Sequence, residues 1–260
     1  MGEIYKTYGV KCFECNVRKQ KKFYDCVNCF SSELVCIQEG ACYSCLEPRI
    51  EEYQKYKNCY RCNEKIKNKQ YFLDGMISCS YKYTLDSDFG FMIHSYKGAK
   101  MQKREWLSFP LQSLTYVFLK KHIECIENKF GKIDAIVPIP GSAEILIPSE
   151  VSNILPINNI LVDNRKQGKQ SEGSAAREFN KDRFTVYNKE NLKSVILFDD
   201  VHTLGGTANS AAYALKQSGV ENVVLFVLCT HLKSSQSKYI DKDLKYDIDK
   251  CMICGATSKI

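Results

Sequence analysis

The stretch SVILFDDVHTLGGTANSAAYALKQSG, residues Ser194–Gly219, predicts a strand, two acids, a loop of small residues and a helix in direct succession. SVILF is apolar almost throughout, which is typical of a central parallel strand that is covered on both faces. Asp199 and Asp200 follow at its carboxyl end, where open α/β sheets bind their ligands. We therefore expect an α/β fold with a binding site at the end of this strand.

The loop HTLGGT, residues His202–Thr207, is mainly small and polar, so its backbone N–H groups can approach an anion closely. Thr207 is expected to cap the alanine-rich helix that Gly219 ends, and the positive end of that helix favours an anion at the same place. A phosphate at the loop and hydroxyl groups at the two acids describe a ribose 5-phosphate. The lysine of a Walker loop is missing, which excludes that motif. An ordinary strand–turn–helix with solvated acids is the alternative.

Composition sets the broad class of the chain. Its 260 residues are 44% hydrophobic and 26% charged, which predicts one sizeable α/β domain with a small appendage. The formal net charge of +7 permits acidic partners such as nucleic acid or phosphorylated metabolites. No run approaches the roughly 20 apolar residues of a membrane span, and no secretion leader is visible. We expect a cytoplasmic protein with no membrane insertion.

Fourteen cysteines add a second theme, because ten of them form five C-x-x-C pairs. Two such turns complete a tetrahedral four-cysteine zinc site, so four pairs near the N-terminus predict two structural zinc ions. The predicted ligands are Cys12, Cys15, Cys26, Cys29, Cys42, Cys45, Cys59 and Cys62. Sequential pairing leaves intervals of ten and thirteen residues, and a cross-braced pairing stays open. Reduced structural thiols are the alternative; a disulfide framework is disfavoured without a secretion signal.

The fifth pair, Cys251/Cys254, has no partner pair left in the chain. It is either a third, incomplete metal site or a turn without metal. The isolated cysteines are expected to be small buried hydrophobes, and they are Cys36, Cys79, Cys125 and Cys229. The histidines are scattered without ligand spacing, and they are His94, His122, His202 and His231. Of these, His202 alone lies inside the predicted phosphate loop.

The chain divides into three predicted parts: a zinc-ribbon domain over 1–68, an α/β domain over 69–232 and an extension over 233–260. Within the second part, ISCSYKYTL and FGFMIHSYKG predict a strand pair, and helical spacing after Pro110 predicts a helix that Gly131 stops. KIDAIVPIPG, FTVYN, SVILF and NVVLFVLC predict further strands. Alternation of strands and helices implies a parallel sheet.

ILFDDVHTLGGT resembles the 5-phosphoribosyl-1-pyrophosphate (PRPP) motif of type I phosphoribosyltransferases. The C-x-x-C pairs ahead of it are similar to the ComF-like branch, in which a double zinc ribbon precedes the transferase domain. HSYKG, IVPIP, VLCTHL and the segment NRKQGKQSEGSAAREFNKDRF are looser matches, and the likeness extends to about Leu232. The resemblance implies a parallel-sheet phosphoribosyltransferase fold.

The resemblance also implies roles for individual residues. Asp199 and Asp200 would contact the ribose hydroxyls. The 5-phosphate would be held by Thr203, Leu204, Gly205, Gly206 and Thr207. Mg²⁺ would accompany PRPP, and cations of a mobile loop would offset the charge of the leaving pyrophosphate. These cations are Arg165, Lys166, Lys169 and Arg177.

One segment departs from the family pattern. Residues 141–159, GSAEILIPSEVSNILPINN, contain no Arg or Lys, whereas the family has a basic stretch there. This departure favours a ComF-like protein that binds PRPP and handles single-stranded DNA, together with DNA-uptake or recombination proteins, over a working transferase. The alternative is an active phosphoribosyltransferase that moves ribose 5-phosphate from PRPP to a base or amine.

The prediction of DNA binding rests on two basic segments that also carry aromatic rings. They are RKQKKFY, residues 18–24, and KIKNKQYF, residues 65–72. Cations there would follow the phosphate backbone while the rings stack on bases. The predicted stacking residues are Phe23, Tyr24, Tyr71 and Phe72.

Overall fold

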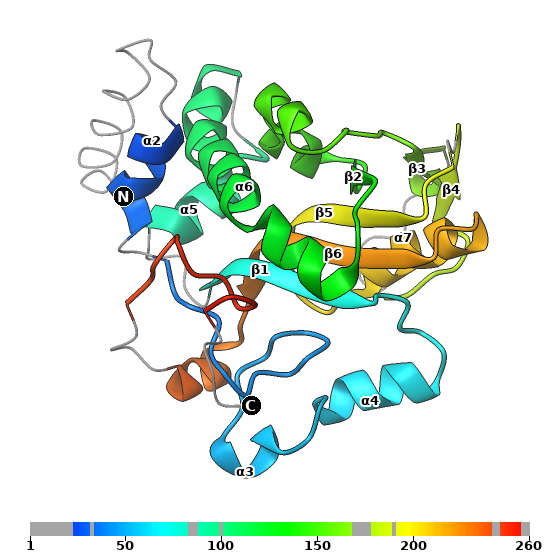
Figure 1. Cartoon of the computed structure of the whole chain (residues 1–260), viewed down its shortest axis with the longest axis horizontal. Helices are drawn as coiled ribbons and strands as arrows, with labels where there is room; N and C mark the ends of the chain where they lie inside the picture. Colours follow the sequence, from blue (N-terminus) through cyan, green and yellow to red (C-terminus); the bar gives the residue numbers. More distant parts are fainter. Residues whose placement is uncertain are drawn as a thin grey trace.

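A parallel sheet with helices on both faces forms the centre of the molecule. The computed structural model describes residues 23–31, 34–82, 88–98, 101–167, 178–188, 191–240 and 245–255. Within this part of the chain, four strands form one sheet in the order β1-β6-β5-β2, and every neighbouring pair is parallel. The strands are β1 (Gly75–Lys82), β6 (Asn222–His231), β5 (Ser194–His202) and β2 (Ala135–Pro138). Figure 1 shows β1, β6 and β5 side by side, with the long helix α6 across them.

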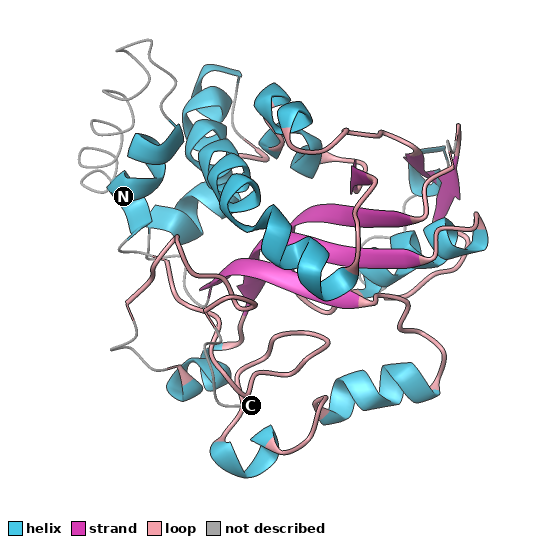
Figure 2. Ribbon diagram, in the orientation of Figure 1, coloured by secondary structure: helices cyan, strands magenta, loops and turns pink. Residues whose placement is uncertain are grey.

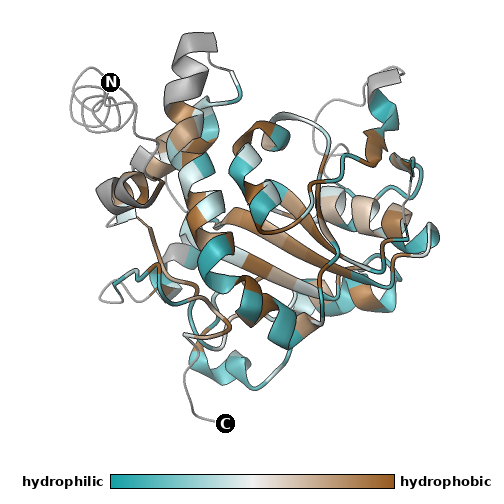
Figure 3. Cartoon of the chain, turned by 45° about the horizontal axis from the view of Figure 1, so that its top comes forward, coloured by the Kyte–Doolittle hydropathy of each residue, from teal (hydrophilic) through white to brown (hydrophobic). Residues whose placement is uncertain are grey.

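Alternating side chains of the central strands enter two separate cores. Val224 and Phe226 of β6 point to the face covered by α6 (Met101–Phe130), where the rings of Phe118 and Phe226 lie 5.2 Å apart. Val223 and Leu225 point to the opposite face, against α7 (Gly206–Gln217). A strand with both faces covered is apolar over its buried length, which is why β5 contains the run Val195–Phe198 and β6 the run Val223–Cys229. Figure 3 shows these strands predominantly brown between helices with teal outer surfaces.

The remaining elements surround this sheet, as the secondary-structure colouring of Figure 2 shows. The other α-helices of the described residues are α2 (Phe23–Phe30), α3 (Glu51–Gln54), α4 (Tyr60–Lys67) and α5 (Asp88–Ser95). Short 3₁₀ helices are η2 (Ser142–Leu146), η3 (Ser149–Asn153), η4 (Asn164–Gln167) and η6 (Ser234–Tyr239). In the described residues, β3 (Leu161–Asp163) and β4 (Phe184–Val186) form a separate antiparallel pair. FTVYN therefore forms a strand as predicted, but it lies outside the parallel sheet.

The cysteine-containing segment packs on the sheet through several contacts. Phe23 of α2 packs against Phe109 and Tyr116 of α6, with ring centroids 5.8 and 4.6 Å apart. Farther along, Val35 forms an antiparallel bridge with Tyr81 on the outer edge of β1. The Tyr81 hydroxyl donates to the Leu46 carbonyl at 2.6 Å. The division of the chain at residue 68 stays a prediction.

Two local predictions are wrong. FGFMIHS belongs to helix α5 rather than to a strand, because its buried residues recur at helical spacing: Phe89, Met92 and Ile93 all face the core. The long helix α6 already begins at Met101 and includes Pro110, although it stops before Gly131 as predicted. Gly131 has φ +87°, the left-handed conformation that ends many helices.

None of the helices in the described residues is both long and apolar enough to cross a membrane.

Candidate functional site

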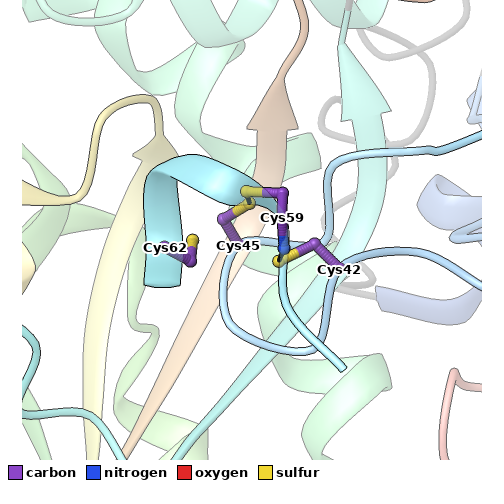
Figure 4. Close-up of side chains that lie close together, drawn as sticks. All are labelled: Cys42, Cys45, Cys59 and Cys62. Carbon is purple, nitrogen blue, oxygen red and sulfur yellow. Dashed lines mark hydrogen bonds between the residues drawn. The ribbon is translucent and has the colours of Figure 1, made fainter. Parts of the chain in front are cut away.

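Two C-x-x-C turns meet at one point beside the sheet. Cys42 and Cys45 lie on a tight turn, whereas Cys59 precedes helix α4 and Cys62 lies in its first turn. Figure 4 shows these four side chains gathered between the loop and the start of α4. Their sulfur atoms lie within 4.8 Å of one another. The structure thus brings together the second predicted group as sequential pairing expects.

The spacing of these sulfur atoms suits a tetrahedral metal ion. Zn–S bonds of about 2.3 Å place two sulfurs of a tetrahedral site roughly 3.8 Å apart. The sulfur atoms of Cys45 and Cys59 are 3.8 Å apart. The pKa of the Cys42 thiol is well below its usual range, because Cys45, Cys59 and Cys62 donate hydrogen bonds to it. The group can hold a metal ion, and zinc is consistent with its four thiols.

Polar contacts hold the two cysteine turns together. Arg49 donates to the Gly40 carbonyl at 2.9 Å and to the Ala41 carbonyl at 3.1 Å on the first turn. The same guanidinium donates to the Tyr56 carbonyl at 2.5 Å, which leads into the second turn. These bonds fix the relative position of the two turns without help from the sulfur atoms.

The first predicted cysteine group lies mostly outside the described residues. Cys12, Cys15 and the side chain of Cys29 fall there, whereas Cys26 is buried in α2.

The two acids lie at the carboxyl end of β5 and occupy different environments. Asp200 is 2% exposed; its Oδ2 accepts from the Tyr96 hydroxyl at 2.7 Å and pairs with Lys97 Nζ at 2.6 Å. Tyr96 and Lys97 belong to the HSYKG segment, so folding brings two of the looser motifs together. The carboxylate of Asp199 faces the loop after β5, where it lines a small cavity of about 40 Å³.

Asp199 is a weaker acid than an aspartate that is exposed to solvent. Burial and the charge of Asp200 raise its pKa to about 8, although Lys97 opposes this shift. A carboxyl with this pKa exchanges a proton near neutral pH, and such groups are concentrated at functional sites.

The loop after β5 passes directly into α7. Gly205 has φ +74° and is the residue that precedes the helix, where it provides no side-chain cap. The predicted cap at Thr207 is wrong, because Thr207 is already helical and its Oγ1 accepts a hydrogen bond from Arg183 at 2.6 Å. A Cβ at position 205 would approach His202 Nε2 to 2.7 Å, so both space and backbone conformation require glycine. The cavity beside Asp199 includes backbone at Gly205, Gly206 and Thr207.

Arg183 and Arg165 share one carboxylate. Arg165 pairs with Asp163 Oδ2 at 2.8 Å, and the buried Arg183 reaches the same atom at 3.3 Å. Burial would raise the pKa of Asp163, but the hydrogen bonds and charges of both arginines lower it overall. Sequence reasoning overlooked Arg183, which links this pair to Thr207.

The other predicted loop cations are not described: Lys169 and Arg177 lie outside the described residues, as does the side chain of Lys166.

A cleft of about 250 Å³ separates the cysteine group from the loop after β5. Its lining includes Cys45, Arg61 and Lys65 on one side and His202, Thr203 and Leu204 on the other. Lys65 crosses from one side to the other and donates to the Leu204 carbonyl. Burial, with the charges of Lys65 and Arg61, lowers the pKa of His202 to about 4.

Three of the four predicted stacking residues pack within the protein. Phe23 is 7% exposed, and the ring of Phe72 lies 5.3 Å from Phe179 and 5.0 Å from Tyr213. Tyr71 donates its hydroxyl to the Ser44 carbonyl at 3.0 Å. Base stacking by Phe23 is therefore wrong, and the side chain of Tyr24 lies outside the described residues.

Other aromatic rings of the cysteine segment are exposed instead. We call them the exposed tyrosine group: Tyr43, Tyr53, Tyr56 and Tyr60. Tyr60, at the start of α4, is 81% exposed. The ammonium of Lys57 lies 4.4 Å from the Tyr43 ring, and that of Lys55 lies 5.3 Å from the Tyr56 ring.

A second group that could hold a metal ion joins distant parts of the described chain. Cys251 and Cys254 meet His122 and Cys125 of helix α6. Sequence reasoning took Cys125 as a small hydrophobe and His122 as a scattered histidine. The available signal was their spacing of three residues within a predicted helix, which places both side chains on one face.

No protein-family model matches this chain, and a comparison with curated proteins finds no significant match.

Proposed function

We propose that this chain is a ComF-like protein that binds PRPP or another ribose 5-phosphate ester at the end of β5. The observation that carries this proposal is the single cavity that Asp199 shares with the loop at Gly205–Thr207. Backbone N–H groups at the start of α7 suit a phosphate, and a carboxylate beside them suits sugar hydroxyls. Arg183, bound to Thr207, adds a buried cation behind the loop.

Binding without turnover is the form of this activity that the surroundings favour. In the segment after β2, which contains no Arg or Lys, the Gly141 N–H donates to Glu144 Oε1 at 2.9 Å. A carboxylate at this position opposes the charge of a pyrophosphate. Mg²⁺ would neutralise part of that charge, and the oxygen ligands of Asp199 and Asp200 suit this ion.

The alternative is an active phosphoribosyltransferase, and the raised pKa of Asp199 favours it. A carboxyl with a pKa near 8 can take up or release a proton at the reacting sugar at neutral pH. Release of pyrophosphate from PRPP, measured with a panel of bases and amines, would establish the transferase and overturn binding without turnover.

A thermal-shift titration tests the ligand itself. PRPP and ribose 5-phosphate should raise the melting temperature of the full chain, whereas ribose should not, because the loop recognises the phosphate. Asp199→Asn with Asp200→Asn should abolish the shift. The matched control is Asp182→Asn, an exposed acid that does not line the cavity. A double variant that still responds like the wild type would overturn the site.

We further propose that the exposed tyrosine group binds single-stranded DNA. Four exposed rings, with Lys55 and Lys57 beside two of them, offer stacking surfaces together with cations for the backbone. Each stacked base contributes about 1–3 kcal/mol in known single-strand binders. Since Glu51 and Glu52 of α3 are also exposed, we expect the rings to contribute more than net charge.

Fluorescence anisotropy with a labelled single-stranded oligonucleotide tests this surface. Tyr56→Ala with Tyr60→Ala should weaken binding by about tenfold or more, since about 1.4 kcal/mol changes affinity tenfold. Tyr187→Ala is the matched control, because Tyr187 is 53% exposed but follows β4. Wild-type protein without saturable binding at low salt would remove the DNA-handling role, and the thermal-shift result would still decide the ribose 5-phosphate site.

A further inference from the structure

The C-terminal C-x-x-C turn lies against helix α6, far from it in sequence. His122 and Cys125 are one helical turn apart and face this turn. Cys254 Sγ lies 3.6 Å from His122 Nδ1 and 3.5 Å from Cys251 Sγ. Cys125 Sγ lies 4.0 Å from the same nitrogen. All four ligand atoms fall within 4.8 Å of one another.

These separations match a tetrahedral site with three sulfurs and one nitrogen. Zn–S bonds of about 2.3 Å and Zn–N bonds of about 2.0–2.1 Å put neighbouring ligand atoms roughly 3.5–3.8 Å apart. Such a closed site has no position for water, which is the coordination of structural zinc rather than catalytic zinc.

The imidazole of His122 is oriented for metal binding. Its Nε2 lies 2.9 Å from the Ile248 carbonyl oxygen. A carbonyl can only accept a hydrogen bond, so Nε2 carries the proton and Nδ1 directs its lone pair at the thiols. A backbone carbonyl on the second ring nitrogen is the usual support of a metal-binding histidine.

The tail turn is shaped to hold two thiolates. The backbone N–H groups of Ile253 and Cys254 lie 3.4 Å from Cys251 Sγ, and the N–H of Cys251 lies 3.3 Å from Cys254 Sγ. Backbone N–H groups around both sulfur atoms are outer-shell contacts of the kind that orient ligands toward a metal ion. Gly255 closes the turn, because its N–H donates to the Cys251 carbonyl at 2.6 Å and a Cβ there would meet that oxygen at 2.8 Å.

We propose that His122, Cys125, Cys251 and Cys254 bind one structural Zn²⁺ that fastens the C-terminal segment to α6. The segment around this site already packs on the core through Tyr246, Ile248 and Ile253. The ion joins two parts of the chain that are more than 120 residues apart in sequence. This site is independent of the proposed ribose 5-phosphate and DNA surfaces.

Metal analysis of the reduced full-length protein provides the first test. Cys251→Ser with Cys254→Ser should lower the zinc content by one ion per chain relative to the wild type. Cys36→Ser is the matched control, because Cys36 donates to the Lys245 carbonyl at 3.3 Å but lies outside the group. An unchanged zinc content in the double variant overturns the proposal. A Cys251–Cys254 disulfide that persists in wild-type protein prepared under reducing conditions overturns it as well.

Cobalt substitution provides a second test that does not depend on loss of a ligand. His122→Cys should keep the metal content of the wild type while it converts one site from three sulfurs and one nitrogen to four sulfurs. The Co²⁺ d–d bands should shift accordingly, because ligand type sets the field at the metal. An absorption spectrum identical to that of the wild type would overturn the assignment of His122.

Discussion

The two sides of the 250 Å³ cleft differ in whether their polar groups have hydrogen-bond and charge partners that stabilise them. On one side, the cysteine group at Cys42–Cys62 is held by its own hydrogen bonds and by Arg49, and a metal ion would stabilise it further. On the other side, His202 Nδ1 is buried without a hydrogen-bond partner in the described chain. His202 also lines the smaller cavity, in which burial and the charge of Asp200 raise the pKa of Asp199. The first side therefore stabilises the fold, whereas the second holds groups whose burial is unfavourable, and the proposed ligand site would make use of them.

The largest effect should come from the cysteine side. Cys42→Ser removes a buried ligand, and we expect loss of one zinc ion and of about 3–5 kcal/mol of unfolding free energy, because metal binding contributes to folding. Urea unfolding and metal analysis measure both quantities, with Cys36→Ser as the control. If both the stability and the zinc content of Cys42→Ser equal those of the wild type, the claim that the cysteine side stabilises the fold through a metal ion is wrong.

The next effect is a loss of stability in acid from His202. Its pKa falls from 6.5 in the unfolded chain to about 4 in the folded protein. Stability is therefore complete above pH 6.5 and decreases as the pH falls toward 4, by about 2 kcal/mol at pH 5. His202→Gln should flatten this part of the profile in urea titrations at pH 7 and 5. If the free energy of unfolding of both proteins decreases equally between pH 7 and pH 5, the pKa of His202 is not lowered as described.

Asp199 should show the opposite dependence on pH. Its folded pKa of about 8 lies above the unfolded value of 3.8, so stability falls as the pH rises between these two values. Asp199→Asn should consequently stabilise the ligand-free protein at pH 7.5 but hardly at pH 4. Melting temperatures at both pH values measure this difference against Asp182→Asn. A variant less stable than the wild type at pH 7.5 would place Asp199 among the stabilising groups.

The smallest effect concerns the contact between the two sides. Lys65→Ala removes the bond from α4 to the Leu204 carbonyl and should weaken ribose 5-phosphate binding about two- to fivefold, since one hydrogen bond contributes about 0.5–1 kcal/mol. Lys67→Ala is the matched control, because Lys67 is on the same helix but pairs with Glu64. Calorimetric titration with ribose 5-phosphate measures the affinity of each variant. Equal affinities would mean that the two sides act separately.

Local patterns predicted much of the fold. Continuous apolar runs identified β5 and β6, and the C-x-x-C spacing identified the group at Cys42–Cys62. The prediction failed where two periods competed, as in Phe89–Tyr96: aromatic residues there suggested a strand, but the buried residues recur every three or four positions, which is helical spacing. The spacing of buried residues was the better guide.

Contacts between distant segments were harder to predict. The sequence around His122 and Cys125 does not identify Cys251 and Cys254 as their partners, because only folding brings α6 and the C-terminal turn together. Similarly, Phe72 lies in a basic segment that suggests an exposed ring, yet it packs on Phe179 and Tyr213. The succession of β5, a short loop and α7 was predictable because it is encoded in consecutive residues, although the predicted cap at Thr207 was wrong.

The parallel pairing of β1 with β6 has a consequence for synthesis on the ribosome. The first paired residues of the two strands, Gly75 and Val224, are 149 residues apart in sequence. At translation rates of about 5–20 residues per second, β1 emerges roughly 7–30 s before its partner. During this interval Val35 can cover one edge of β1 at Tyr81, while the other edge is open to association with other chains. A ribosome that stalls before Asn222 would therefore carry a nascent chain with an unpaired, aggregation-prone strand.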